Sequence, residues 1–366
     1  MKIAFVLINH PPADERIWFQ EAEILRNSGC EITIVSTQED TLLLPCVYCF
    51  DSVGISKREV IRKIASVLLP VIPDVIICDN PIAVLAARHY KKQVRQAVRI
   101  IYDVTEWYPA YNNLRGLSFM RQVIKSFLLT ALSFYSALFL SGFIFGEYYK
   151  ALPFRIFFPW KKHIYLPYYA DVDKVKVYPV NDISKKCILL YAGNLTARKG
   201  FDAVLNVAKT SAGLFPDISF VLRILSGSPR HDFGELPANI VIQFIPYLPF
   251  PAFCEEIGKA DICFDLRKIN MESTHCLPIK IFYYMAAGRP VIYSDLKAIR
   301  REIPEINKFG HLVDPENRGE IISLVSRYIK DGDYYRNSCV AARRLAEEKY
   351  DWRKINHRLI TFIKGN

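Results

Sequence analysis

The amino-acid sequence predicts an α/β protein with two doubly wound parallel sheets, one in each half of the chain. Apolar runs of strand length alternate with segments of helical period, as is typical of parallel strands covered by helices on both faces. The 366 residues are enough for about two domains of ordinary size. A polar stretch of alternating charge, residues 171–186, predicts a linker between them.

The first half begins with a strand, a helix and a second strand, which predicts parallel pairing through a right-handed crossover. Gly29 suits the residue that ends the helix. The expected elements are strand 2–8, helix 15–28, strands 30–35, 75–78 and 100–103, helix 119–137 and strand 138–145.

The second half repeats the pattern. Its expected elements are strands 187–191, 220–225, 240–244, 262–264 and 291–293 and helices 201–212 and 279–287. We therefore expect an N-terminal domain at 1–170, a C-terminal domain at 187–345, and a helical segment at 346–366 that packs back on the N-terminal domain.

The composition restricts the function and the compartment. Subtracting 37 acidic from 48 basic residues leaves a net charge of +11, which favours anionic partners. The nine cysteines mostly lie in apolar runs, as is typical of reduced thiols in the cytoplasm. The opening apolar run is too short for a secretory signal. One isolated CxxC predicts no metal site, and no nucleic-acid recognition module is present.

Two features raise the question of a membrane. Residues 126–146 carry no charge over 21 positions, which is long enough for a helix that spans a membrane. We favour the alternative, a buried helix followed by a buried strand. Between Glu106 and Glu147 there is no acidic residue, and residues 88–99 and 150–162 are rich in cations. The charge pattern predicts reversible binding of the N-terminal domain to an anionic membrane face.

Two strand–turn–helix junctions carry candidate chemistry. Residues 193–200 place Arg198 and Lys199 before a helix, an arrangement that can hold a diphosphate. At the second junction Pro278 suits the start of a helix, and Lys280 lies beside its free amides. Neither junction has the glycine pattern of a nicotinamide dehydrogenase or a P-loop ATPase.

Six short motifs follow one another along the chain: the run from His10 to Arg16, Tyr102 to Glu106, and segments 166–171, 191–200, 278–292 and 350–352. In this order they resemble the motifs of retaining glycosyltransferase family four. The resemblance covers nearly the whole chain. It implies the GT-B fold, in which two Rossmann-like doubly wound parallel-sheet domains face each other across a cleft.

The resemblance implies transfer of a sugar from a nucleotide diphosphate sugar to a glycan or lipid-linked acceptor, in the synthesis of cell-surface polysaccharide or glycoconjugate. It implies no cofactor and no metal, in a cytoplasmic protein peripheral at the inner face of the membrane. The catalytic residues expected from the resemblance are Glu106, His275 and Lys199, and Glu272, three residues before His275, is added as the nearby carboxylate that compensates for the altered positions. The implied donor-binding residues are Gly193, Asn194, Arg198, Lys199, Leu277, Pro278, Ile279, Lys280 and Tyr283. The implied acceptor-side residues are His10, Asp14, Arg16, Asp103 and Thr105.

The chain departs from the family pattern at four positions. Asn194 replaces an arginine, Thr105 a histidine, and His275 and Tyr283 a pair of glutamates. These departures keep a second hypothesis open, a catalytically degenerate GT-B protein that serves as a binding or partner subunit. A nucleotide-sugar epimerase is a third. For Asp14 and Arg16, a mutual ion pair that caps the first helix is the alternative to an acceptor-side role.

Overall fold

A computed structural model describes the chain from residue 1 to 365, except for Asn9, Trp107, Tyr108, Ala110, Arg230, His231 and Glu272. The chain folds into two compact units. Unit 1 comprises Met1–Tyr168 together with Ile355–Asn366, and unit 2 comprises Tyr169–Lys354. Residues 171–186 thus belong to unit 2, where Val172 and Val175 are buried.

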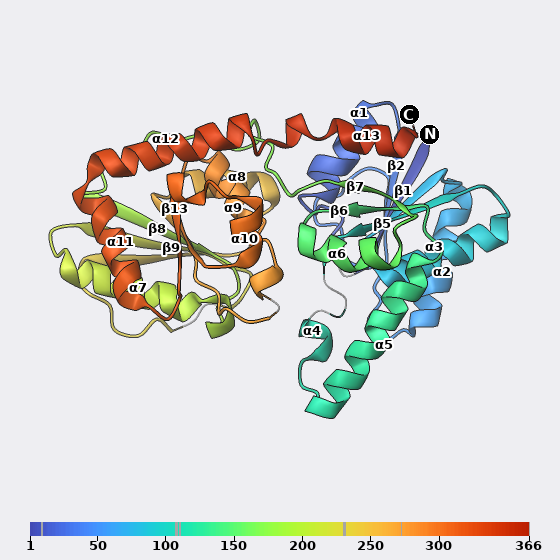
Figure 1. Cartoon of the computed structure of the whole chain (residues 1–366), viewed down its shortest axis with the longest axis horizontal. Helices are drawn as coiled ribbons and strands as arrows, with labels where there is room; N and C mark the ends of the chain where they lie inside the picture. Colours follow the sequence, from blue (N-terminus) through green and yellow to red (C-terminus); the bar gives the residue numbers. More distant parts are fainter. Residues whose placement is uncertain (9, 107–108, 110, 230–231, 272, 366) are drawn as a thin grey trace. The chain divides into compact units, whose positions relative to one another are not determined.

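Unit 1 is built on a seven-stranded sheet in the order β3-β2-β1-β4-β5-β6-β7, with every pair parallel (Figure 1). The strands are β1 (Lys2–Leu7), β2 (Glu31–Ser36), β3 (Val47–Cys49), β4 (Val75–Cys78), β5 (Arg99–Val104), β6 (Gly142–Phe145) and β7 (Lys162–Tyr165). The central strands are buried on both faces, as their continuous apolar sequences predict.

The helices of unit 1 are α1 (Glu23–Asn27), α2 (Lys57–Val71), α3 (Pro81–Val94), α4 (Tyr111–Leu114), α5 (Phe119–Ala137), α6 (Tyr148–Phe157) and α13 (His357–Lys364). The expected helix 15–28 is divided into a π-helical turn at Ile17–Ala22 and the short α1. Asn80 caps α3 by accepting the amides of Ile82 and Ala83 at 2.9 and 3.0 Å.

The uncharged stretch at 126–146 divides between α5 and β6. The helix 119–137 is confirmed, whereas the strand begins at Gly142, because residues 138–140 form turns that donate back to α5. None of the helices in the described part of the chain is both long enough and apolar enough to cross a bilayer.

Unit 2 carries a six-stranded parallel sheet in the order β10-β9-β8-β11-β12-β13. The strands are β8 (Lys186–Ala192), β9 (Ser219–Leu225), β10 (Ile240–Ile245), β11 (Ile262–Asp265), β12 (Val291–Ser294) and β13 (Gly310–Val313). The helices are α7 (Phe201–Leu214), α8 (Phe250–Gly258), α9 (Lys280–Ala286), α10 (Lys297–Glu302), α11 (Arg318–Lys330) and α12 (Gly332–Glu348). The strand order reverses at β8 in this sheet and at β1 in unit 1, the points where doubly wound sheets bind ligands.

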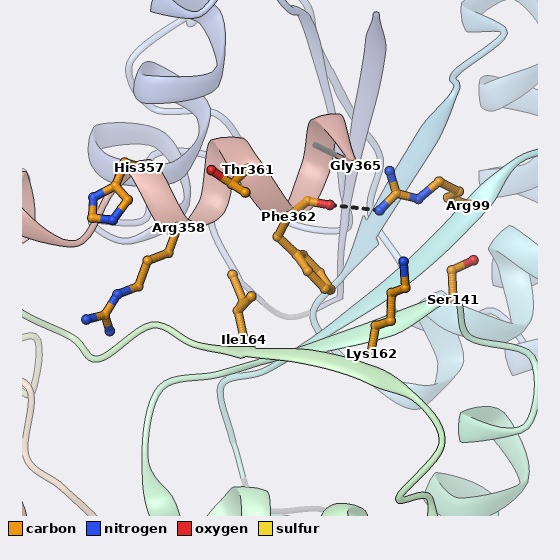
Figure 2. Close-up of a pocket in the computed structure, with 9 residues that line it drawn as sticks. All are labelled: Arg99, Ser141, Lys162, Ile164, His357, Arg358, Thr361, Phe362 and Gly365. Atoms are coloured by element: carbon orange, nitrogen blue, oxygen red, sulfur yellow. Dashed lines mark hydrogen bonds between the residues drawn. The ribbon is translucent and has the colours of Figure 1, made fainter.

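The last helix, α13, returns the chain to unit 1. Arg99 at the start of β5 donates to the Phe362 carbonyl at 2.9 Å, near the end of α13 (Figure 2). It also donates to the Ile363 carbonyl at 2.6 Å. The Phe362 ring lies so close to Gly142 that a Cβ there would be 2.7 Å from it. A pocket of about 820 Å³ lies beside α13, at the amino-terminal end of the sheet.

Candidate functional site

Two clusters of polar side chains lie at the carboxyl ends of strands, one in each unit. The cluster of unit 2 is formed by the residues that follow β8 and β11 and by the start of α9. The cluster of unit 1 is formed by residues that follow β1, β4 and β5. Each is described by itself.

The turn after β8 is held against the loop after β11. Tyr191 donates its hydroxyl to the Asn194 carbonyl at 2.7 Å, and the Lys268 amide donates to the Arg198 carbonyl at 3.0 Å. Gly200 ends the turn with φ of +79°, and a Cβ there would lie 2.0 Å from the Leu266 carbonyl oxygen. Only glycine therefore fits where the two loops cross.

Three cations and one carboxylate gather in this cluster. Lys280 donates its ammonium group to the Ala192 carbonyl, and Arg267 pairs in two places with Asp265, its Nε lying 2.7 Å from Oδ1. Burial alone would raise the pKa of Asp265, but the charges of Arg267, Lys280 and Lys199 hold it below its usual value. The pKa of Lys199 is lowered by desolvation and by repulsion from Arg267. With one carboxylate against three cations, the cluster has an excess of positive charge that suits a phosphate anion.

The other expected donor residues occupy different environments. Leu277 and Pro278 are buried before α9, whereas Asn194 is exposed. His275 Nδ1 lies 3.0 Å from the Met271 carbonyl oxygen, and Glu272 lies outside the described residues. Gly193 lies beside Lys280, whose Nζ would be 3.4 Å from a Cβ at that position.

Tyr283 is part of the interior of unit 2. Its side chain is 1% exposed and packs edge-on against the rings of Phe250 and Phe253 of α8, with centroids 5.4 and 6.2 Å away. At the position where the resemblance places a ribose-binding carboxylate, this chain has an aromatic ring that joins α8 to α9. The ring contributes to packing through its area and its edge-to-face geometry.

In unit 1 Arg16 is the centre of a buried ionic cluster. Its Nε lies 2.9 Å from both Asp103 and Glu21, and its second amino group lies 3.0 Å from Asp103. A further bond to the Leu166 carbonyl measures 3.0 Å, and the guanidinium lies over the Tyr168 ring. Burial, followed by the charge of Asp103, raises the pKa of Glu21 well above its usual value.

The mutual ion pair considered for Asp14 and Arg16 is wrong in part. Asp14 does cap the start of the helical segment, because its Oδ1 accepts the amides of Arg16 and Ile17 at 3.0 and 3.2 Å. The Arg16 guanidinium, however, is directed to Asp103 and Glu21. His10 lies near Asp14, with 4.0 Å between Nδ1 and Oδ2.

Glu106 lines a cavity of about 290 Å³ between the end of β5, α5 and α6. Lys150, which pairs with Glu147, lines the same cavity and donates to the Thr105 carbonyl. The Thr105 hydroxyl is buried and has no hydrogen-bond partner in the described part of the chain. The cavity therefore combines an exposed carboxylate with a buried cation.

Asp79, at the end of β4, belongs to the same region. Its Oδ2 accepts the Ile8 amide at 2.8 Å, while its Oδ1 is buried without a hydrogen-bond partner among the described residues. Burial, and then the charges of Glu106 and Asp103, raise the pKa of Asp79 well above its usual value.

Sequence reasoning missed Asp79, Asp265 and Arg267 as site residues. Asp79 directly follows the buried strand β4, Asp265 ends the buried strand β11, and Arg267 lies two residues beyond it. A polar residue at the carboxyl end of a buried strand is the signal that could have identified them. For metals, the described residues contain no group of three or more His, Cys, Asp or Glu side chains arranged to hold an ion.

Comparisons with known proteins agree on the architecture. No family model matches the sequence, and no curated protein matches it. The structure is similar to sucrose-phosphate synthase from Thermosynechococcus elongatus, with a TM-score of 0.72 and 14% identity over 100% of this chain and 98% of that one. It is equally similar to HepE from Anabaena in complex with UDP, with a TM-score of 0.72 and 14% identity over the whole of both chains.

A glycosyltransferase from Rickettsia africae matches with a TM-score of 0.66 and 14% identity over 100% of this chain and 98% of that one. At sequence identities this low, the similarity supports a shared fold and nothing finer. Two parallel-sheet α/β units together with these neighbours confirm the GT-B fold that the motifs imply.

Proposed function

We propose that this GT-B chain is a glycosyltransferase that moves a sugar from a nucleotide diphosphate sugar to an acceptor. The observation that carries the proposal is the cationic cluster of Lys199, Arg267 and Lys280 at the carboxyl ends of β8 and β11. It lies at the point where the strand order of unit 2 reverses. The similar HepE structures hold UDP and UDP-glucose, which makes uridine nucleotides the first donors to test.

The chemistry that such a cluster supplies is electrostatic. When the bond between the anomeric carbon and the diphosphate oxygen breaks, negative charge develops on the leaving diphosphate. Lys280 is held in place by its bond to the Ala192 carbonyl, so it needs little reorganisation to stabilise that charge, and the exposed Lys199 adds a second cation beside it. Arg267 keeps Asp265 neutralised, and this prevents the carboxylate from repelling the phosphates.

The finer parts of the proposal rest on the sequence resemblance and on the unit 1 cluster. We propose retention at the anomeric carbon, hexosyl transfer, and a glycan or lipid-linked acceptor used in polysaccharide or glycoconjugate synthesis. The acceptor would enter beside Glu106 and His10. The buried Arg16 cluster shapes this end of unit 1 and does not contact the acceptor directly, because Arg16 is 3% exposed.

Calorimetric titration with UDP, GDP and ADP, followed by hydrolysis assays with their sugars, tests the proposal. Lys199→Ala should weaken binding of the preferred nucleotide at least about tenfold, since a charge-assisted contact contributes about 1.5–3 kcal/mol. Lys186→Ala is the matched control, because Lys186 is an exposed lysine at the opposite end of β8. Equal affinities of Lys199→Ala and wild type, or no nucleotide binding at all, would contradict the proposal.

A further inference from the structure

The first half of α5 leaves its apolar side chains uncovered. Phe119 is 77% exposed and Phe127 is 73% exposed. Figure 1 shows this end of α5 projecting away from the sheet of unit 1. The exposed large apolar side chains on this stretch are Phe119, Met120, Val123, Ile124, Phe127 and Leu128.

The second half of the same helix is packed in the ordinary way. Leu129, Ser133 and Ala137 are buried. Arg88 of α3 donates to the Tyr135 hydroxyl at 2.8 Å and lies over the Phe139 ring at 3.4 Å. The helix is thus anchored on unit 1 by one half and presents the other half, residues 119–128, outward. We call these ten residues the apolar tip.

The charge around the apolar tip identifies its partner. Arg121 and Lys125 lie on it and Arg115 lies just before it, while no acidic residue occurs between Glu106 and Glu147. Two copies of this surface would place cations against cations. An anionic bilayer instead offers hydrocarbon for the apolar side chains and negative headgroups for the cations.

We infer that the apolar tip of α5 is an interfacial segment that docks unit 1 on an anionic membrane surface. Ten helical residues extend over about 15 Å, about half of a hydrocarbon core, so the tip enters one leaflet only. Further exposed apolar side chains lie on the same unit: Ile156 near the end of α6 is 63% exposed and Trp160 just after α6 is 69% exposed. Phe157 of α6 contacts Phe134 in the second half of α5, at 4.9 Å between centroids.

Docking through α5 also determines where a lipid-linked acceptor would meet unit 1. This consequence rests on the proposed function. Thr130, Ser133 and Phe134 follow the apolar tip on the same helix and line the cavity that contains Glu106. An acceptor anchored in the bilayer by a lipid would therefore meet unit 1 within a few helical turns of that carboxylate. Membrane docking itself needs neither donor nor acceptor.

Vesicle flotation of the full chain tests the inference. Wild type should float with vesicles of phosphatidylcholine and phosphatidylglycerol, bind vesicles of phosphatidylcholine alone much more weakly, and be released by salt. Phe127→Ser should lower the partition coefficient by about tenfold or more. Val53→Ser, at an 84% exposed position in the loop between β3 and α2, should leave it within about twofold.

Charge variants separate this surface from the other basic patch of unit 1. Arg121→Gln with Lys125→Gln should weaken binding to anionic vesicles by about fivefold per charge. Lys92→Gln with Arg95→Gln, at the end of α3 and just after it, should change it by less than about twofold. UDP titration of the same variants should be unchanged, which separates failed docking from failed donor binding. The inference is overturned by absence of vesicle binding, by insensitivity to the α5 variants, or by a dimer that Phe127→Ser dissociates.

Discussion

Replacing Arg16 by methionine removes the only cation that contacts the buried carboxylates Asp103 and Glu21 in the described structure. The substitution deletes two ionic bonds to Asp103, at 2.9 and 3.0 Å, and one to Glu21 at 2.9 Å. It also leaves the Leu166 carbonyl without its donor. Methionine keeps most of the side-chain volume, so lost packing contributes little.

The expected cost follows from the burial of the cluster. The side chains of Arg16 and Asp103 are each 4% exposed, and that of Glu21 is fully buried. Burial, and then the charge of Asp103, raise the pKa of Glu21, so removing Arg16 leaves two buried carboxyl groups beside each other without a cation. Breaking a buried ion pair by removing one partner costs about 3–5 kcal/mol, and we expect a loss of that size in unit 1.

Native-state hydrogen exchange measures the loss where it occurs. Amides of β4 and β5 report on unit 1, and amides of β8 and β11 in unit 2 serve as the internal reference. Lys2→Met is the control variant. Its pair with Glu31 spans 3.9 Å between side chains that are 44% and 64% exposed, so it should cost no more than about 1 kcal/mol. If Arg16→Met costs no more than Lys2→Met, Arg16 does not compensate the buried charge.

Three further predictions follow from single positions. Gly200→Ala should destabilise unit 2 by at least about 2 kcal/mol in urea unfolding, because the new Cβ would clash with the Leu266 carbonyl. Gly29 also has a positive φ but has no atom near its Cβ position, so Gly29→Ala should cost only about 1 kcal/mol. Equal costs of the two variants would contradict the close approach at Gly200. Burial raises the pKa of Asp79 above its value in the unfolded chain, so the folded state binds the proton more tightly and stability falls as pH rises above about 4. Asp79→Asn should reduce this slope by up to about 1.4 kcal/mol per pH unit, and an unchanged slope of the urea midpoints against pH would refute the raised pKa. Tyr283→Glu should lower the thermal midpoint of unit 2 by several degrees, since it buries a carboxylate, while Tyr283→Phe should cost about 1 kcal/mol; a Glu variant as stable as wild type would place the side chain in solvent.

The sequence predicted the central strands well because their physical signal is local. Residues 75–78 and 262–264 are continuous apolar runs, and both become strands buried on two faces. The edge strands β3, β7 and β13 were missed. Val47–Cys49 is short and mostly exposed, and Lys162–Tyr165 and Gly310–Val313 mix polar with apolar residues. An edge strand needs only one neighbour and imposes little on its sequence.

For the candidate sites, local position predicted some residues and long-range partners determined others. Lys199 and Lys280 could be predicted as site residues because each lies at a junction between a strand, a turn and a helix. The role of Arg16 depends on Asp103, 87 residues further along the chain, and no local pattern reveals that pairing. The packing of Tyr283 on Phe250 is equally non-local, because α8 and α9 are separated in sequence by β11 and its loop.

The return of the chain to unit 1 through α13 makes unit 2 an inserted domain. Residues Tyr169–Lys354 form one uninterrupted segment, whereas unit 1 is assembled from two pieces of the chain. A gene fragment that encodes unit 2 can therefore be excised whole. Unit 1 needs its short second piece supplied in trans or spliced to Tyr168, because without it the Phe362 ring leaves Gly142 and Arg99 loses both of its carbonyl acceptors. Fragment complementation with a synthetic peptide of residues 355–366 is thus a natural way to control the assembly of unit 1 separately from that of unit 2.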